Sequence, residues 1–250
     1  GTLTYGNMMV SDVFCGDGRV LDMTRGPAKL RHLFQTAIVA TNGAEYIGHK
    51  IRGGNSTDRA LLALVSPTQY SEILGGLNIK NKLPFDSAYK FTAATVGRNM
   101  TFYTGAPERI LDRVTSYTDG TGKEKPVSRR ALDNVLTGAA RDAKRVLAIG
   151  YSRGARPTTV GQLPTDLVLV ALVTIHDGIR PEATHAVSQI KRAGVQVMMI
   201  TGDNLETATA VARQTGIVSG DNDVCINAAE LEQKSDAALM RLLPKLRVVA

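Results

Sequence analysis

The chain has 250 residues, enough for one large domain or two ordinary ones, and its 43% hydrophobic and 21% charged content is usual for a soluble globular protein. Its formal net charge of +7 favours a polyanionic partner, but the basic residues form only loose groups, without the dense runs or motif spacings of nucleic-acid-binding proteins. The absence of Trp and the 5% aromatic content argue against an aromatic stacking platform.

The first part of the chain, from about residue 8 to 165, alternates helical patterns with strands that read as antiparallel. The elements expected in chain order are a helix at 28–42, a helix at 58–67, a hairpin-like pair of strands at 83–97 and 98–105, a helix at 106–120, an amphipathic helix at 129–145 and a strand at 146–153. Pro107 near the start and Gly120 at the end support the segment 106–120 as a helix. This alternation predicts an α+β region.

From about residue 166 the pattern becomes regular. The expected elements are a strand at 167–175, a loop at 176–180, a helix at 181–194, a strand at 195–201, a helix at 205–216, and a further helix and the start of a strand within 230–250. Continuous apolar strands that alternate with amphipathic helices are typical of a parallel sheet covered on both faces. We therefore expect an α/β region here.

Polar residues follow the predicted strand at 195–201, where an open α/β sheet binds its ligands. Gly202 permits close approach of the backbone, and the Thr201 hydroxyl and the amides at the start of the next helix suit phosphate oxygens. Asp203 could bind a ribose or lie near a magnesium ion. The alternative is that Asp203 or Asn204 only caps the helix.

A second candidate site lies in the first region. Phe85 offers a ring on which adenine can stack, and Lys90 offers a charge for a phosphate. Phe85 could instead be a core aromatic residue and Arg145 a solvated charge. Thr57 and Asp58 could simply cap the helix that follows them.

The segment DGIRPEATHAVSQIKRAGVQVMMITGDNLETATAVARQTGI closely resembles the phosphorylation-domain segment of P-type ATPases, cation pumps of the haloacid dehalogenase class. Other stretches resemble motifs of this family in the same order: GTLT, GGNSTDRALLALV, LPFDSAYKFTAATV, YTGAPERIL and KRVLAIGYSR. The resemblance covers nearly the whole chain. It is most similar to the calcium-type pumps, with the sodium/potassium- and magnesium-type pumps as the next alternatives.

The resemblance implies an α+β nucleotide-binding domain at 8–176, inserted into a partial Rossmann-like domain of the haloacid dehalogenase type with a parallel sheet, at 1–7 and 177–250. It implies ATP and Mg²⁺ as cofactors. The residues that it places at ATP are Thr57, Asp58, Phe85, Lys90, Thr104, Gly105, Arg145 and Leu147, with Asp177 and Arg180 in the hinge turn. It places Thr201, Gly202 and Asp203 at the phosphoryl and magnesium end.

Some residues depart from the family pattern. Thr104 replaces a lysine, which removes a cation from the expected adenine pocket and predicts weaker ATP binding. Ser87 stands where many relatives have an arginine, and Asp58 replaces a longer Glu. The segment DGIR lacks the prolines of the usual hinge turn, which puts the rigidity of this hinge in doubt.

The resemblance also implies a larger pump. Because the motif's aspartate nucleophile would precede Gly1 and a second acidic cluster would follow Ala250, we expect a monomeric fragment that binds ATP but does not turn over. The expected location is the cytoplasmic face of a membrane, with the transmembrane and actuator domains as partners and no nucleic acid. The alternatives are a stand-alone phosphatase of the haloacid dehalogenase type and a basic nucleic-acid-binding module.

Three further features are assigned no role in the pump. Cys15 and Cys225 have no motif spacing, which predicts free thiols and no metal site. The longest apolar run, 167–175, is about half of a bilayer span, and no signal peptide is visible. The GDND stretch at 220–223 lacks the pattern of a calcium loop and reads as a polar turn.

Overall fold

The computed structural model describes residues 2–98, 100–142, 144–154 and 163–250. Contacts between residues divide the chain into two units. The larger unit comprises Met8–Gly138 and Arg145–His176, and the smaller unit comprises Gly1–Asn7, Ala139–Lys144 and Asp177–Ala250. Each unit has its own hydrophobic core and is described separately.

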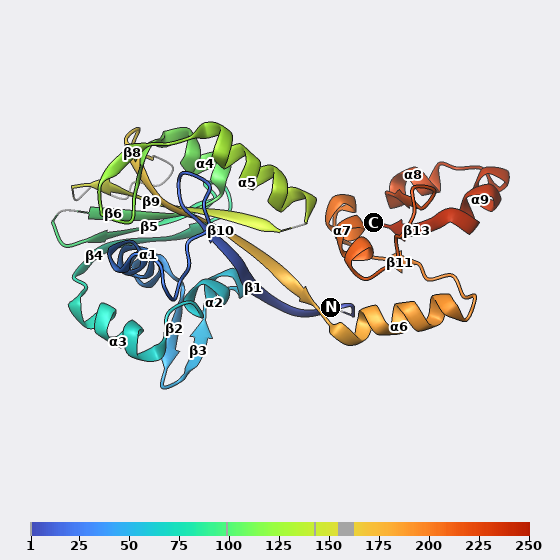
Figure 1. The fold of residues 1–250 in the computed structure, drawn as a ribbon, viewed down its shortest axis with the longest axis horizontal. Helices are drawn as coiled ribbons and strands as arrows, with labels where there is room; N and C mark the ends of the chain where they lie inside the picture. Colours follow the sequence, from blue (N-terminus) through green and yellow to red (C-terminus); the bar gives the residue numbers. More distant parts are fainter. Residues whose placement is uncertain (1, 99, 143, 155–162) are drawn as a thin grey trace. The chain divides into compact units, whose positions relative to one another are not determined.

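The larger unit is built on a mainly antiparallel sheet (Figure 1). Its strand order is β4-β5-β6-β9-β10-β7-β8, with β1 paired to β10. The strands are β1 Thr4–Phe14, β4 Ile79–Asp86, β5 Phe91–Val96, β6 Met100–Gly105, β7 Val114–Thr118, β8 Glu124–Pro126, β9 Arg145–Arg153 and β10 Leu167–Ile179. The start of β1, up to Asn7, and the end of β10, from Asp177, belong to the smaller unit. A separate hairpin joins β2 Ala44–Ile47 to β3 Lys50–Gly53.

Alternation of side chains along the strands gives this sheet two buried faces. Ala94 and Phe102 belong to one core, whereas their neighbours Ala93 and Tyr103 belong to the other. Helix α1, Ala28–Thr41, packs on the first face together with α2 Ser56–Leu62 and α3 Pro67–Gly76, and α4 Pro107–Ile110 and α5 Arg129–Arg141 lie on the second (Figure 1). The sheet is therefore a middle layer between two groups of helices.

The smaller unit contains a parallel sheet in the order β11-β13-β12. Its strands are β11 Met199–Ile200, β12 Val224–Ile226 and β13 Leu246–Val249, and its helices are α6 Pro181–Arg192, α7 Leu205–Gln214, α8 Ala228–Glu232 and α9 Asp236–Leu242. Small residues of α7, Ala208 and Ala212, pack against Val248 of the central strand and Val187 of α6. Small side chains let the helix approach the sheet closely.

Two of the predicted elements in the first region were wrong. The segment 83–97 was expected to be a single strand, but it contains the end of β4, a turn and β5. The segment 106–120 was expected to be a helix, but helix α4 is short, a 3₁₀ turn follows at Leu111–Arg113, and β7 begins at Val114. Residues Val114–Thr118 are rich in β-branched and aromatic side chains, and the Arg129 guanidinium binds the carbonyls of Leu111 and Val114 at 2.6 and 2.8 Å.

The strand predicted at 167–175 exists but belongs to the larger unit. It is β10, which pairs antiparallel with β9 and parallel with β7 and continues to Ile179 through the predicted loop. Burial on both faces produces the same apolar run in a parallel or an antiparallel sheet, so the pattern alone wrongly placed this strand in the α/β region, whereas the bounds 8–176 expected from the resemblance include it in the first domain. The strand expected at 195–201 is shorter, Met199–Ile200, and 230–250 forms two more short elements than expected.

Other expectations about local structure were confirmed. Helices occupy most of 28–42 and 129–145. In the segment 58–67 the helix covers only the first half, because α2 begins earlier, at Ser56 after its cap Asn55, and ends at Leu62. Cys15 and Cys225 are free thiols. Over the described ranges, no helix has both the length and the apolar character needed to cross a bilayer.

Candidate functional site

The pairing registers bring four strand ends of the larger unit together. Asp86 pairs with Phe91, Phe91 with Gly105, and Gly105 with Ala148, so the end of β4, the start of β5, the end of β6 and the start of β9 share one end of the sheet. The predicted residues that lie on these strand ends are Phe85, Lys90, Thr104, Gly105, Arg145 and Leu147. We call this the sheet-end cluster.

Phe85 lies on β4, the edge strand of the sheet, and the residue is 55% exposed. The register shift between Leu83 and Asp86 leaves Pro84 and Phe85 opposite the single residue Thr92, which is a β-bulge. Bulges and edge strands tolerate proline, and bulges redirect side chains. The alternative of a core aromatic residue at position 85 was therefore wrong.

Lys90 closes the tight turn between β4 and β5. Its φ of +58° is the left-handed region, and its N–H donates to Asp86 O at 2.7 Å. The Asp86 carboxylate also accepts from the N–H groups of Ala88 and Tyr89 at 2.7 and 3.2 Å, which holds the turn. A left-handed residue other than glycine costs about 1–2 kcal/mol, a strain that is often found at functional sites.

The amine of Lys90 pairs with Glu108 at the start of α4, with 3.1 Å between Nζ and Oε1. Its own backbone N–H group and the nearby Lys90 ammonium lower the pKa of Glu108. Both side chains are more than half exposed, at 54% and 58%, so the pair contributes little to stability. Lys90 is thus held by its backbone while its charge stays accessible to a ligand.

Gly105 is required by close packing of the backbone. A Cβ atom at this position would lie 2.4 Å from Lys90 O and 2.6 Å from Phe91 Cβ. The next residue, Ala106, donates its N–H to the same Lys90 carbonyl at 2.9 Å. The glycine therefore fixes the turn that carries Lys90 against the end of β6.

Thr104 is buried, at 5% exposure, and its hydroxyl lies 2.9 Å from that of Thr41 near the end of α1. Leu147 is partly buried against the core on the α1 face, and Arg145 is exposed at the start of β9. Among these three residues, only Arg145 presents a charge at the surface. Thr104 serves as a packing and hydrogen-bonding residue in this structure.

Thr57 and Asp58 lie in the first turn of α2 and are half-buried. The cap of this helix is Asn55, whose side chain accepts from the Asp58 N–H at 2.9 Å while Asp58 Oδ2 accepts from the Asn55 N–H at 3.0 Å. The alternative that Thr57 and Asp58 cap the helix is therefore correct only for Asp58, which takes part in the capping box. The N-cap residue itself, Asn55, was not predicted. The side chain of Asn42, at the end of α1, donates to Asp58 O at 2.9 Å and so ties α1 to α2.

In the smaller unit, Thr201 follows the short strand β11. Its N–H donates to Val249 O at 3.0 Å, and its hydroxyl accepts from the Asp203 N–H at 3.2 Å. The cap of α7 is Asn204, which accepts from the Thr207 N–H at 2.9 Å. Because Asn204 is the cap, the exposed side chain of Asp203 is not needed for that role.

Asp177 and Arg180 contact the start of β1 within the smaller unit. Asp177 Oδ2 accepts from the Thr4 hydroxyl at 2.7 Å, and Arg180 Nε donates to Thr4 O at 2.9 Å. The Arg180 guanidinium also lies over the Tyr5 ring, 5.3 Å from its centroid. The other carboxylate oxygen of Asp177 is buried, and no hydrogen bond to it is found among the described residues.

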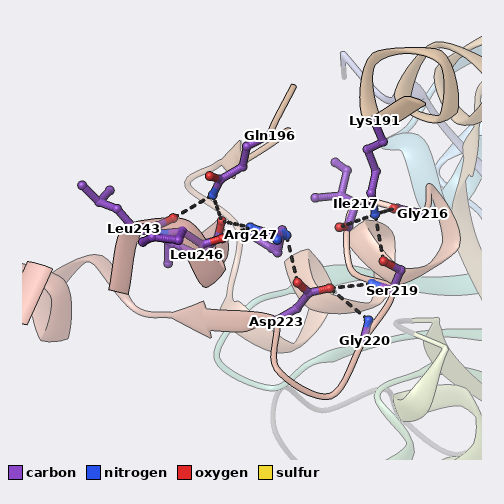
Figure 2. Close-up of polar contacts among 11 residues, drawn as sticks. Lys191, Gln196, Gly216, Ile217, Ser219, Gly220, Asp223, Leu243, Leu246 and Arg247 are labelled. Carbon is purple, nitrogen blue, oxygen red and sulfur yellow. Dashed lines mark hydrogen bonds and ion pairs between the residues drawn. The ribbon is translucent and has the colours of Figure 1, made fainter. Parts of the chain in front are cut away.

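Within the smaller unit, a network of polar contacts joins the segment that follows α7 to α6 and β13 (Figure 2). Lys191 of α6 donates to the carbonyl of Gly216 and the hydroxyl of Ser219, both at 2.8 Å, and so covers the carbonyl end of α7. Asp223, in the predicted polar turn, pairs with Arg247 of β13 at 2.9 Å and accepts from the N–H groups of Ser219 and Gly220. This network is structural.

Comparison with known protein families shows to which family the chain belongs. Residues 29–182, more than half of the chain, match the family described as P-type ATPase, cytoplasmic domain N. The chain belongs to this P-type ATPase family.

Individual relatives of this P-type ATPase chain carry calcium-transporting names. The chain is 32% identical to the calcium-transporting ATPase PAT1 of Dictyostelium discoideum and 28% identical to the plasma membrane calcium-transporting ATPase 4 of Bos taurus. It is 30% identical to a calcium-transporting ATPase of Listeria monocytogenes. All three matches cover 100% of this chain but only 24%, 24% and 30% of the relatives, so the chain spans about a quarter of their length.

Three contacting residues of this P-type ATPase domain were missed by the sequence interpretation. Glu108 pairs with Lys90, Asn42 joins α1 to α2, and Lys82 donates from β4 to Asn42 O at 2.5 Å. Glu108 lies in the quoted stretch YTGAPERIL and could have been proposed from the lysine nearby. Asn42 and Lys82 lie 40 residues apart and have no spacing signal that could have paired them.

Proposed function

We propose that the larger unit binds ATP and that the chain is the nucleotide-binding part, with a portion of the phosphorylation part, of an ATPase that transports a cation across a membrane. Calcium is the proposed ion, since the relatives reported above are named calcium-transporting ATPases. The chain would act on the cytoplasmic side. Transport itself would need the remainder of a polypeptide of the relatives' length.

The observation that carries this proposal is the exposed ring of Phe85 at the sheet-end cluster. An aromatic ring that folding leaves 55% exposed is available to stack on adenine. Lys90 and Arg145, on neighbouring strand ends, would place positive charge near the triphosphate. A helix cap alone would explain Asp58, but it does not explain an exposed aromatic residue next to a strained lysine.

The smaller unit supplies groups that suit phosphate. We propose that the Thr201 hydroxyl and the N–H group of Gly202 hold the transferred phosphoryl group, and that Arg180 contacts nucleotide phosphates. No set of three or more His, Cys, Asp or Glu side chains gathers at metal-binding spacing within the described ranges. This fits Mg²⁺, which commonly binds through one or two carboxylates plus substrate phosphates.

Asp203, which is exposed and is not the helix cap, is the proposed carboxylate beside Mg²⁺. When bound, the metal would neutralise the charge on the phosphates during transfer to an aspartate and hydrolysis of the aspartyl phosphate. Asp203 would orient the metal, and Thr201 would donate to a phosphoryl oxygen. Gly202 has open space where a side chain would stand, which allows a ligand to approach the backbone.

ATP binding can be tested on the 250-residue chain by calorimetric and nuclear-magnetic-resonance titration. We expect amide shifts around Phe85, Lys90 and Arg145, and about tenfold weaker binding in Phe85→Ala, since stacking on a base contributes ~1–3 kcal/mol. Leu74→Ala, which truncates a 42% exposed apolar side chain on α3, is the matched control and should bind as the parent chain does. No shift at millimolar ATP would refute the proposal.

The transported ion needs a separate experiment. The full-length protein, reconstituted in vesicles, should accumulate calcium when ATP and Mg²⁺ are added, and Asp203→Asn should slow this accumulation. ATP-driven transport of another cation without any uptake of calcium would leave the ATP site standing but refute the assignment of the ion.

A further inference from the structure

The amine of Lys82 lies at the carboxyl end of α1, beside the sheet-end cluster. Lys82 is on β4, three residues before Phe85, and its Nζ donates to Asn42 O at 2.5 Å. The hydroxyl of Thr104 contacts Thr41, the preceding residue of the same helix end. A flexible lysine on the edge strand thus brings its charge to the part of the structure where Thr104 replaces the expected lysine.

Pairing registers place Lys82 on the same face of the sheet as Thr104. Lys82 pairs with Ala94, which belongs to the core on the α1 face. Thr104 pairs with Ile149 of that same core. Since side chains alternate between faces along a strand, both residues point to the side of α1.

The charge of Lys82 interacts with that of Asp58. Although the side chain as a whole is exposed, burial around the amine lowers the pKa of Lys82, and the carboxylate of Asp58 opposes this effect. Asn42 connects the two residues, because it accepts from Lys82 Nζ through its carbonyl and donates to Asp58 O through its side chain. A cation and an anion therefore flank Asn42.

Both groups have unused hydrogen-bonding capacity among the described residues. A lysine ammonium has three donors, and the Lys82 amine makes the single hydrogen bond to Asn42 O. The Asp58 carboxylate uses Oδ2 to accept from the Asn55 N–H, and its Oδ1 makes no hydrogen bond in this part of the chain. A donor and an acceptor are therefore available on the two residues that Asn42 connects.

We propose that Lys82 contacts the nucleotide base, donating to N1 of adenine while Asp58 accepts from the 6-amino group, and thereby does the work of the lysine that is absent at position 104. This inference rests on the proposed ATP binding. The arrangement also selects the base. Adenine presents an acceptor at N1 and a donor at its amino group, whereas guanine presents a donor at N1 and an acceptor at O6, so guanine would meet Lys82 and Asp58 with the wrong polarity.

The competing explanation is that Lys82 only neutralises the carbonyl end of α1. Calorimetric titration of the 250-residue chain with ATP and with GTP separates the two. We expect Lys82→Met to weaken ATP binding by about tenfold while GTP binding changes little, so that the preference for ATP collapses. A purely structural role would weaken both nucleotides equally or neither of them.

Lys80→Met is the matched control, because it removes the same charge from the same strand at a residue for which no hydrogen bond or ion pair is found among the described residues. It should bind both nucleotides within about twofold of the parent chain, as expected for a distant exposed charge. If Lys80→Met lowers the ATP preference as much as Lys82→Met does, the effect is one of net charge and the inference is wrong.

A second substitution distinguishes the loss of a base contact from a general folding defect of Lys82→Met. Adding Thr104→Lys to Lys82→Met should restore ATP binding and the preference over GTP, since one cation near the base is sufficient. Should Lys82→Met fail to give a folded nuclear-magnetic-resonance spectrum, Lys82→Gln, which keeps a neutral donor, decides by the same ATP-to-GTP ratio. An unchanged ratio of ATP to GTP affinity in the folded variant would refute only the role of Lys82. A parent chain that binds no ATP would refute the proposed function as well.

Discussion

The ion pair between Asp223 and Arg247 offers a stringent test of how the smaller unit is held together. The two side chains are only 10% and 20% exposed, and the pair joins the turn before β12 to the central strand β13 (Figure 2). Asp223→Asn keeps the shape of the side chain but removes its charge. Asp221→Asn makes the same charge change two residues away at an exposed position for which no hydrogen bond or ion pair is found among the described residues.

The magnitude follows from the contacts. Removing one partner of a fully buried pair costs about 3–5 kcal/mol, but this pair keeps some solvent exposure, and Arg247 keeps hydrogen bonds to the carbonyls of Pro244 and Leu246 at 3.0 Å. One acceptor oxygen also remains in the Asn side chain for the N–H groups of Ser219 and Gly220. We therefore expect a loss of about 2–3 kcal/mol in the smaller unit.

Amide hydrogen exchange measures this loss in one unit of a two-unit chain, where a single unfolding curve would not. The N–H groups of Thr201 and Ala250, which bond to Val249 O and Ile226 O, should exchange roughly 30- to 150-fold faster in Asp223→Asn, by the factor of ten per 1.4 kcal/mol. Asp221→Asn should leave them within about twofold, as surface changes cost under ~0.5 kcal/mol. Equal protection in both variants would refute the reasoning.

The same pair predicts a dependence on pH. The pKa of Asp223 is lowered in the folded chain: burial acts to raise it, but the N–H groups of Ser219 and Gly220 and the charge of Arg247 outweigh that effect. A lowered folded-state pKa means that the stabilisation is complete above the unfolded pKa of about 4 and is lost as the pH falls through the folded value. Asp223→Asn should lack this part of the acid sensitivity, which exchange measured at pH 6 and at pH 3 would reveal.

Three further variants probe the sheet-end cluster, each by thermal unfolding followed with probes in the larger unit. Gly105→Ala should destabilise the unit by about 2 kcal/mol or more, because its Cβ would overlap Lys90 O and Phe91; an unchanged melting temperature would contradict this. Lys90→Gly should stabilise the unit by about 0.5–1 kcal/mol through relief of its left-handed φ while weakening ATP binding, and a loss of stability would show that the turn is not strained. Thr104→Val should cost about 1 kcal/mol, since the Thr41 hydroxyl keeps its bond to Ala37 O, and a cost near zero would mean that the hydroxyl pair contributes nothing.

Helix periodicity and turn chemistry could be predicted from the sequence where local interactions decide the structure. The helix over most of 28–42 and the polar turn at 220–223 follow from spacing and from short polar side chains. The helix predicted at 106–120 failed, because its second half gains more by adding β7 to the sheet beside β10 than by continuing a helix. Local preference is weak, and pairing with a distant strand outweighs it.

The sequence by itself determined the family resemblance and, through it, the residues predicted to bear the chemistry: an aromatic ring, lysines and a Thr-Gly-Asp turn. Residue type and order carry such a resemblance without any coordinates. Only the tertiary structure decided where they stand. A bulge in β4 leaves Phe85 in solvent, the registers of four strands bring distant ends together, and a carbonyl 40 residues away holds the amine of Lys82. Such placements depend on long-range pairing and packing, which no local run of residues encodes.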